Sequence, residues 1–147
     1  MESSSRTTRH ELDKQLSFAL YGATGRMVRL HKPFLDPLGL TFPQYLVMVE
    51  LLDRSPRSVG ELGARVGMDT GTITPLVKRL EIAGLITRRR DARDERRVLV
   101  ALTSAGEALR EGVWAVPGQI MSACKITDAQ AEELRAALDS MAQSAEY

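Results

Sequence analysis

The stretch that decides the fold spans residues 58–103 and reads SVGELGARVGMDTGTITPLVKRLEIAGLITRRRDARDERRVLVALT. Its first half predicts two short helices. Ser58 and Glu61 have the spacing of a capping box that opens the first helix, and Gly67 stops it. The second helix ends at Gly84. Its candidate N-terminal caps are Asp69, Thr70 and Thr72. Two helices joined by a tight turn predict a helix-turn-helix.

The second half of the stretch changes to a strand pattern. Residues 85–88 and 97–102 are rich in apolar and β-branched side chains, and the polar residues 90–96 separate them. This pattern predicts a β-hairpin with a charged tip. In the helix before it, the residues expected to face inward are Ile73, Leu76, Val77 and Leu80.

A long amphipathic helix is predicted upstream, from Leu12 to near Pro33. Its apolar residues recur in steps of three and four, and they are Leu12, Leu16, Leu20, Ala23, Met27 and Leu30. A helix of about 20 residues is roughly 30 Å long, so this apolar face would overhang a core built by one small chain. We therefore expect it to pack against a partner subunit.

Three further helices complete the predicted order. Thr41 and Gln44 form a capping box for a helix from about Phe42 to Asp53. Its expected inward residues are Tyr45, Leu46, Val49, Leu51 and Leu52. After the hairpin, Thr103 and Ser104 can cap a helix, with a capping box of Ser104 and Glu107 and a kink or interruption at 116–118. Residues 127–130 open the last helix, whose apolar face is Leu134, Ala137, Leu138 and Met141.

Composition excludes several classes of protein. The 147 residues suffice for one domain, with a net charge of +1 and 44% hydrophobic residues. We interpret residues 1–10 as a flexible leader and 11–147 as a single domain. No apolar run predicts a membrane span. With Cys124 as the single cysteine, neither a disulfide framework nor a cysteine-based zinc site is expected, which fits a reducing cytoplasm. No metal or cofactor is predicted.

The basic residues are concentrated in one region although the total charge is balanced. Eight of the twenty lie within residues 76–97. A charge run is usually a solvated surface, but this one directly follows a helix-turn-helix. A helix in the major groove with an arginine-bearing hairpin in the minor groove is a coherent way to dock on DNA. No triad order, phosphate loop or metal-ligand spacing points to an enzyme.

The order of elements, together with the wing at residues 91–103, which reads DARDERRVLVALT, resembles the MarR family of winged-helix regulators. Residues 16–21, 32–45 and 69–76, which read LSFALY, KPFLDPLGLTFPQY and DTGTITPL, are similar to the organic-hydroperoxide regulator branch, OhrR. The resemblance implies a mainly α fold with a small β-hairpin wing, a winged helix-turn-helix in a homodimer.

The resemblance also implies that the protein binds a pseudo-palindromic operator in double-stranded DNA and represses the adjacent gene. Residues 11–40 and 104–147 would dimerise, and 41–103 would bind DNA. The implied DNA-binding residues are Thr70, Thr72, Thr74, Lys78, Arg79, Arg93 and Arg96. Asp94 would brace one of the wing arginines. The competing interpretation is a winged-helix module that docks proteins and does not bind DNA, for which the arginine wing has no use.

The sensor region departs from the OhrR pattern. Ser17 occupies the position of the peroxide-reactive cysteine, and a serine hydroxyl cannot be oxidised as a thiol can. Of three tyrosine positions, Tyr21 is kept, whereas His31 and Phe42 are changed. Ser17 reflects either natural divergence or a replacement made to trap the reduced state, and the two other changes favour divergence.

Two expectations follow for the signal. Ser17, Tyr21, His31 and Phe42 would line a pocket between the first two helices for a small aromatic or phenolic ligand, unless His31 is simply a surface histidine at a helix end. Cys124 is either a buried inert thiol or a redox residue that bonds its mate across the dimer. Release from DNA would then follow from a small effector or from oxidation.

Overall fold

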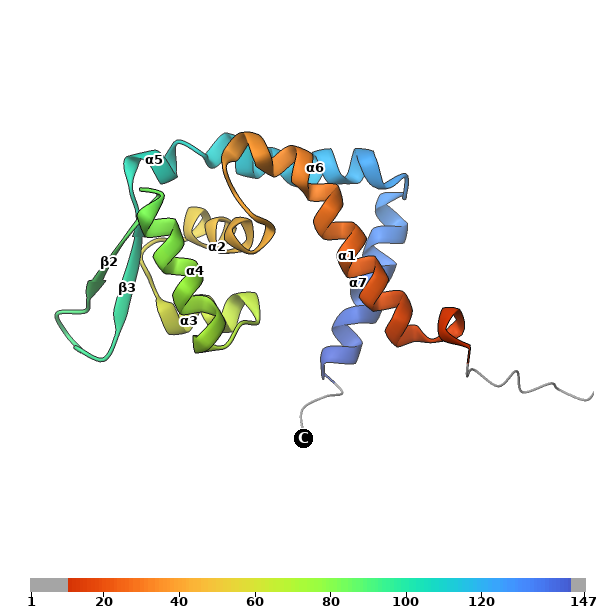
Figure 1. Cartoon of the computed structure of the whole chain (residues 1–147), viewed down its shortest axis with the longest axis horizontal. Coiled ribbons are helices and arrows are strands. Elements are labelled where there is room, and N and C mark those ends of the chain that lie inside the picture. The colour runs from red at the N-terminus through yellow and green to blue at the C-terminus, as the bar shows by residue number, and fades with distance from the viewer. Residues whose placement is uncertain (1–10, 144–147) are drawn as a thin grey trace, which may run out of the picture.

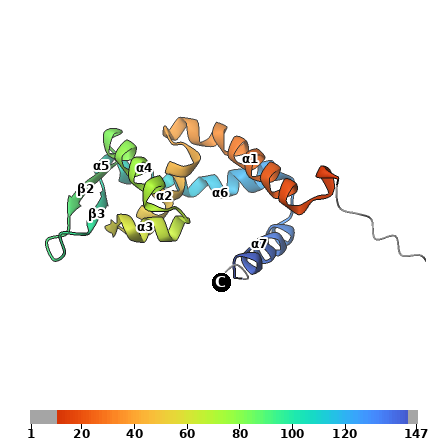
Figure 2. The ribbon, with the colours of Figure 1, turned by 60° about the horizontal axis from the view of Figure 1, so that its bottom comes forward.

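The structure is a computed structural model that describes residues 11–143; the leader predicted for 1–10 lies outside the described residues. The elements in chain order are η1 (Leu12–Lys14), α1 (Leu16–Leu35), η2 (Asp36–Leu38), α2 (Phe42–Asp53), β1 (Arg57–Ser58), α3 (Val59–Val66), α4 (Thr70–Ile82), β2 (Ile86–Arg90), β3 (Val98–Leu102), α5 (Ser104–Glu107), α6 (Arg110–Cys124) and α7 (Asp128–Gln143). Figures 1 and 2 show the helix-turn-helix and hairpin at one end and α7 at the other, bridged by α1 and α6. The predicted winged helix-turn-helix is confirmed.

Helix α2 lies at the centre of the core. It packs against α1, α3, α4, α6 and β3. The predicted capping box forms, since Gln44 N donates to Thr41 Oγ1 at 3.3 Å and Thr41 N donates to Gln44 Oε1 at 3.0 Å. The predicted inward face was only partly right. Val47 and Met48 are buried, whereas Leu46 and Val49 are half-buried, because a helix surrounded by neighbours buries more than one stripe.

The turn between α3 and α4 is built as the sequence predicts. Gly67 adopts a left-handed φ of 69°, and Met68 N donates to Gly63 O at 2.8 Å. A side chain at Gly63 would meet the Met68 carbonyl oxygen, so this close approach requires glycine. Among the candidate caps of α4, Asp69 is the one used, because its Oδ1 accepts from Thr72 N at 2.9 Å.

The hairpin belongs to a sheet with strand order β1-β3-β2, all antiparallel. Strand β1 is two residues long, too short for the strand pattern to reveal. The hairpin also pairs further toward its tip than predicted: Arg90 lies opposite Val98, so the loop starts at Asp91.

Several predicted boundaries were wrong. Helix α1 begins at Leu16 after a separate 3-10 turn, and it continues through Pro33 to Leu35. Helix α6 contains Pro117 without interruption; the break lies at residues 108–109 instead.

The capping box expected of Ser104 and Glu107 is absent. Thr103 is the cap: its Oγ1 accepts from Gly106 N at 3.1 Å and donates to Gly84 O at 2.6 Å. The last helix starts as predicted, because Thr127 and Gln130 exchange both capping hydrogen bonds. Among residues 11–143, no helix is long and apolar enough to cross a membrane.

Replacing Gly106 with alanine tests the junction between α5 and the sheet. An added Cβ would overlap the backbone oxygen of Leu85, which cannot move without disturbing β2. We expect Gly106→Ala to lower the free energy of unfolding by about 1–3 kcal/mol, as overpacking does. The matched control is Gly60→Ala in α3, where the nearest atom is 3.9 Å away; it should stay within about 1 kcal/mol of wild type. Equal midpoints in denaturant titrations of both variants would contradict this packing.

Candidate nucleic-acid interface

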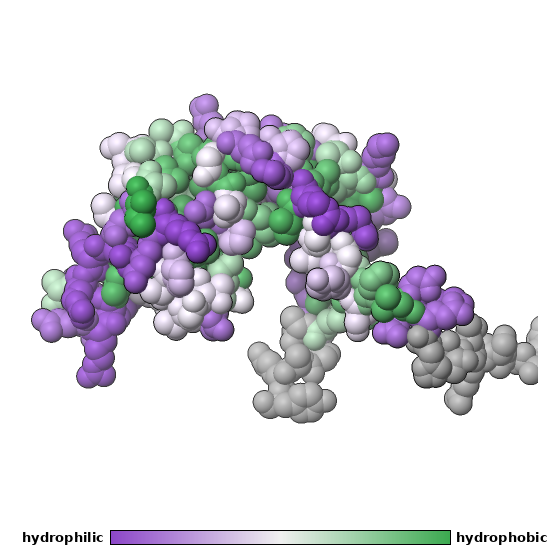
Figure 3. Space-filling view, viewed as in Figure 1, coloured by the Kyte–Doolittle hydropathy of each residue, from purple (hydrophilic) through white to green (hydrophobic). Residues whose placement is uncertain are grey.

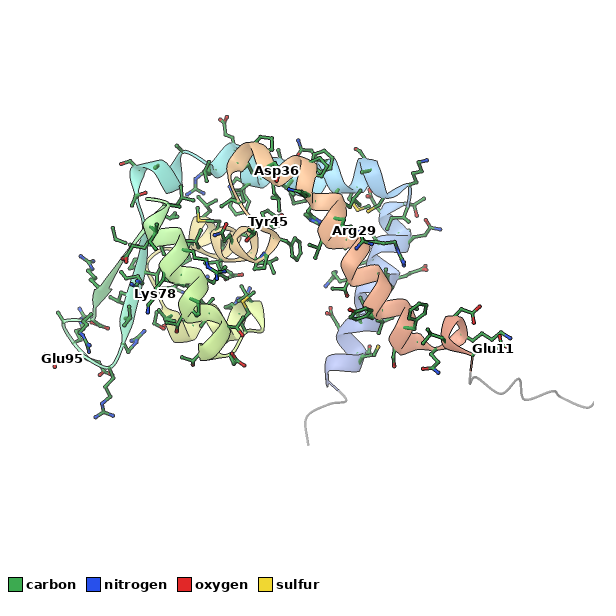
Figure 4. All side chains as sticks on the ribbon, viewed as in Figure 1. Glu11, Arg29, Asp36, Tyr45, Lys78 and Glu95 are labelled. Carbon is green, nitrogen blue, oxygen red and sulfur yellow. The ribbon has the colours of Figure 1, made fainter. Side chains whose placement is uncertain are left out.

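Helix α4 separates an apolar face from a polar one. Ile73, Leu76, Val77 and Leu80 are buried against the core. Thr70, Thr72, Lys78 and Arg79 are exposed on the other face, and Thr74 is half-buried. Figure 4 shows Lys78 on this helix beside the hairpin. All five residues of this region that the sequence predicts to bind DNA therefore lie on the single helix α4. Thr74 is the least accessible of them.

The wing tip presents two exposed arginines on an ordered loop. Asp91 Oδ1 accepts from Arg93 N at 2.9 Å, and Asp94 Oδ1 accepts from Arg96 N at 3.1 Å. Asp94 thus contacts Arg96, one of the wing arginines that it was expected to brace, through the backbone and not through the guanidinium. Its carboxylate supports the backbone of Arg96 and forms no ion pair with a guanidinium among the described residues, because the short aspartate side chain folds back onto its own loop.

The basic residues of this region fall into two groups. Arg88 Nη2 lies 3.0 Å from Glu81 Oε1, Arg97 Nη2 lies 2.7 Å from Glu61 Oε1, and Arg90 donates to the carbonyl of Glu95. By contrast, a second group has no side-chain partner within residues 11–141. This unpaired group is Lys78, Arg79, Arg89, Arg93 and Arg96. Figure 3 shows hydrophilic side chains gathered over the wing.

Arg89 is the member of the unpaired group that sequence reasoning missed. It is exposed and lies opposite Leu99, between Arg88 and Arg90 on β2. Because side chains alternate along a strand, Arg89 faces away from the Arg88 side chain that contacts α4. Strand alternation was therefore the signal that could have separated it from its neighbours.

Ion pairs also hold the frame of the helix-turn-helix. Glu50 of α2, with a side chain only 15% exposed, contacts Arg57 Nη2 at 3.3 Å and Arg65 Nη2 at 3.2 Å. Its hydrogen bond and charge raise the pKa of the Arg65 guanidinium. The hydrogen bonds from Arg88 hold the pKa of the Glu81 carboxyl below its ordinary value, against a smaller opposing effect of desolvation.

His31 is buried, so the expectation of a surface histidine is wrong. Its side chain is 7% exposed, and Nδ1 lies 2.7 Å from the carbonyl oxygen of Met27. The ring meets Phe42 edge-on, with centroids 4.7 Å apart, and Tyr45 at 5.8 Å. Burial raises the pKa of the Tyr45 hydroxyl. This aromatic cluster joins the C-terminal half of α1 to the start of α2.

The other two predicted pocket residues lie elsewhere. Ser17 and Tyr21 are exposed near the start of α1, and Ser17 is roughly 20 Å from His31 along the helix axis at about 1.5 Å per residue. One chain therefore does not assemble the predicted four-residue pocket. A different, largely apolar hollow of about 270 Å³ lies between α1, α2 and α7. Its lining includes Leu20, Met27, Val28, Phe42, Leu134 and Leu138.

Cys124 is a free thiol at the end of α6, half-buried against the core. Within the described part of the chain, no group of three or more His, Cys, Asp or Glu residues is placed to hold a metal ion.

Comparison with known proteins places this arrangement among transcription regulators. Residues 29–112 match the family described as transcriptional regulator SarA/Rot. The organic hydroperoxide resistance transcriptional regulator of Bacillus subtilis is 40% identical over 128 residues, which cover 87% of this chain and 87% of that protein.

Two solved structures extend the comparison. Reduced AbfR of Staphylococcus epidermidis, bound to DNA, is 27% identical with a TM-score of 0.76, covering 90% of this chain and 91% of that chain. BpsR of Bordetella bronchiseptica, whose DNA binding is regulated by 6-hydroxynicotinic acid, is 25% identical with a TM-score of 0.81, covering 90% of this chain and 96% of that chain.

The contact between Glu81 and Arg88 predicts a specific acid sensitivity. Because the folded pKa of Glu81 lies below the ordinary 4.5, its stabilising effect is present above that pH and is lost as the pH falls through the lowered pKa. We expect the stability advantage of wild type over Glu81→Gln to shrink between about pH 5 and pH 3 in denaturant titrations. Glu95→Gln, which removes an exposed carboxylate without an ion pair in the described residues, is the control. An advantage that stays constant across this range would contradict the prediction.

Proposed function

Since this chain belongs to the MarR-like family of winged-helix transcriptional regulators, we propose that it binds a pseudo-palindromic operator as a homodimer and represses transcription. The family consists of regulators and not of enzymes. The observation that carries the proposal is the division of charge. Arg88 and Arg97 are paired with carboxylates, whereas the unpaired group of α4 and the wing is left available for phosphates and bases.

Each element has a role that follows from its chemistry. Helix α4 would enter the major groove, where the hydroxyls of Thr70 and Thr72 are short enough to meet base edges and phosphates. Lys78 would contact phosphate. Arg93 and Arg96 at the narrow wing tip would reach the minor groove, where guanidinium groups are attracted by its negative potential. Arg79 and Thr74 complete the proposed contact set from the recognition helix.

The other end of the molecule supports dimerisation. Helices α1, α6 and α7 expose large apolar side chains that one chain leaves uncovered; they include Leu16, Tyr21, Met27, Trp114, Leu134 and Met141. Tyr21 is 80% exposed and Leu134 is 56% exposed. An exposed apolar surface of this extent marks an interface. We therefore propose that residues 11–40 and 104–147 form the dimer and that 41–103 bind DNA. The single cysteine fits a reducing compartment, so we also propose that the protein acts in the cytoplasm.

Alanine variants on operator DNA test the assignment. Arg96→Ala should weaken operator binding by about 5- to 150-fold and relax sequence preference, because it removes a groove contact. Lys78→Ala should weaken binding to all duplexes alike and reduce the salt slope by about one, because it removes a phosphate contact. Fluorescence anisotropy across a salt series measures both. Lys14→Ala, which removes the same charge far from α4, is the control. Wild-type affinity in both variants would instead favour a protein-docking module.

For the signal, we propose a small aromatic or phenolic ligand. Ser17 replaces the oxidisable residue of the resembling sensors, and the hollow beside Phe42 is apolar and joins α1 to α2. BpsR shows that an aromatic acid regulates DNA binding in this fold. A ligand bound between α1 and α2 would change how the proposed dimerisation helix α1 packs against the winged helix-turn-helix. The separation of the two recognition helices in the dimer would then change. Half-sites about one DNA turn apart would no longer be matched.

Treatment of the DNA complex separates the two signals. An organic hydroperoxide should leave affinity for upstream DNA unchanged, because the Ser17 hydroxyl does not undergo thiol oxidation. Hydroxybenzoic acids and 6-hydroxynicotinic acid, used as probes in anisotropy titrations, should weaken binding, and Phe42→Leu should blunt that response. The control is Cys124→Ser. Loss of binding with hydroperoxide, reversed by dithiothreitol and abolished in Cys124→Ser, would assign sensing to the thiol instead.

A further inference from the structure

Two carboxylates from the helix-turn-helix hold the two strands of the wing. Glu81 of α4 contacts β2, with Oε2 accepting from Arg88 N at 3.0 Å and Oε1 lying 3.0 Å from Arg88 Nη2. Glu61 of α3 contacts Arg97, the residue directly before β3, with its Oε1 lying 2.7 Å from Arg97 Nη2. In each carboxylate, one oxygen contacts a guanidinium and the other accepts a hydrogen bond from a backbone amide. These two contacts fix the orientation of the carboxylate.

Glu61 connects the start of α3 to the wing tip. Its Oε2 accepts from Ser58 N at 3.2 Å and completes the capping box of α3. The guanidinium that it holds, that of Arg97, also lies 3.8 Å from Asp91 Oδ2. Asp91 in turn accepts from Arg93 N at 2.9 Å. A continuous set of contacts therefore leads from a helix cap to the backbone of an arginine at the tip.

The strand ladder stops short of the tip, so the tip is held by hydrogen bonds within the wing and by the contacts of Glu61 with Arg97. The last strand pair is Arg90 opposite Val98, and the residues between them form the loop. Asp91 N donates to Arg97 O at 2.8 Å at the base of that loop, and the Arg97 side chain links the loop to Glu61 of α3. A loop that is not held in place must be ordered when it binds, and that ordering lowers affinity.

We infer that Glu61 and Arg97 are a positioning pair that aims the wing, and that Arg97 is not one of the DNA contacts. The inference rests on the proposed function for its consequence in DNA binding. The wing arginines Arg93 and Arg96 read the groove only when this pair holds the loop against α3. Glu61 thereby determines specificity without touching DNA.

The direction in which operator affinity changes distinguishes a positioning role of Glu61 from a simple effect of its negative charge. Removing a carboxylate near a DNA-binding surface strengthens attraction to every duplex. A positioning role predicts the opposite for the operator: its affinity falls although a negative charge is gone. Both side chains are about half exposed, 46% for Arg97 and 49% for Glu61, so the pair contributes little to global stability and its loss leaves the chain folded.

Glu61→Gln is the decisive variant because glutamine still serves in a capping box while the ion pair is lost. The measurement is the ratio of affinities for upstream operator DNA and a scrambled duplex, at one salt concentration. We expect this ratio to fall about tenfold in Glu61→Gln and in Arg97→Gln, with no further fall in the double variant. Glu95→Gln, which removes an unpaired wing carboxylate, should leave the ratio unchanged. A Glu61→Gln variant that binds both duplexes more tightly, as Glu95→Gln does, would overturn the inference.

A measurement on the free protein keeps this inference separate from the proposed function. Amide hydrogen exchange at Asp91, Arg93 and Arg97 should accelerate at least fivefold in Glu61→Gln and stay at wild-type rates in Glu95→Gln. Unchanged exchange in Glu61→Gln would show that the pair does not hold the loop. If exchange accelerates while wild type itself lacks salt-dependent binding to DNA, the proposed function fails and the positioning contact stands as a property of the wing.

Discussion

Both halves of the molecule rest on helix α2, which packs against α1 and α6 on one side and against α3, α4 and β3 of the winged helix-turn-helix on the other. Val47 and Met48 have no exposed surface. A hydrogen bond also connects α6 to α2, because Arg110 Nη1 donates to the carbonyl of Leu52 at 2.9 Å. This carbonyl lies in the last turn of α2, where the helix itself offers no donor. The packing thus links α1 and α6, through α2, to α4.

The same frame explains how a chain of net charge +1 can carry a basic surface. The carboxylates pair with those arginines that have a structural role, and they belong to Glu50, Glu61 and Glu81. The cations of the unpaired group on α4 and the wing have no such partner among the described residues. Local placement of charge, rather than the total, sets the affinity for a polyanion.

The first helix forms as the resemblance implies, but Ser17 stands where the resembling peroxide sensors have the reactive cysteine. Ser17 lies at an exposed start of α1, and His31 is enclosed by Phe42 and Tyr45 where α1 meets α2. The buried His31 ring and the neighbouring apolar hollow lie where α1, a dimerisation helix in our proposal, packs against α2 of the winged helix-turn-helix. A ligand bound there, as we propose, would act on the contact between α1 and α2.

Short-range features were readable from the sequence alone. The capping boxes of Thr41 and Ser58, the turn at Gly67 and the hairpin each depend on residues close together in the chain, so local pattern predicts them. The DNA-binding face that we propose rests on the order of these elements and on the resemblance to known regulators. Only the tertiary structure decided that Arg97 pairs with Glu61 and that His31 is buried. These outcomes depend on neighbours brought from distant parts of the chain, and no spacing along the sequence encodes which groups meet across a core.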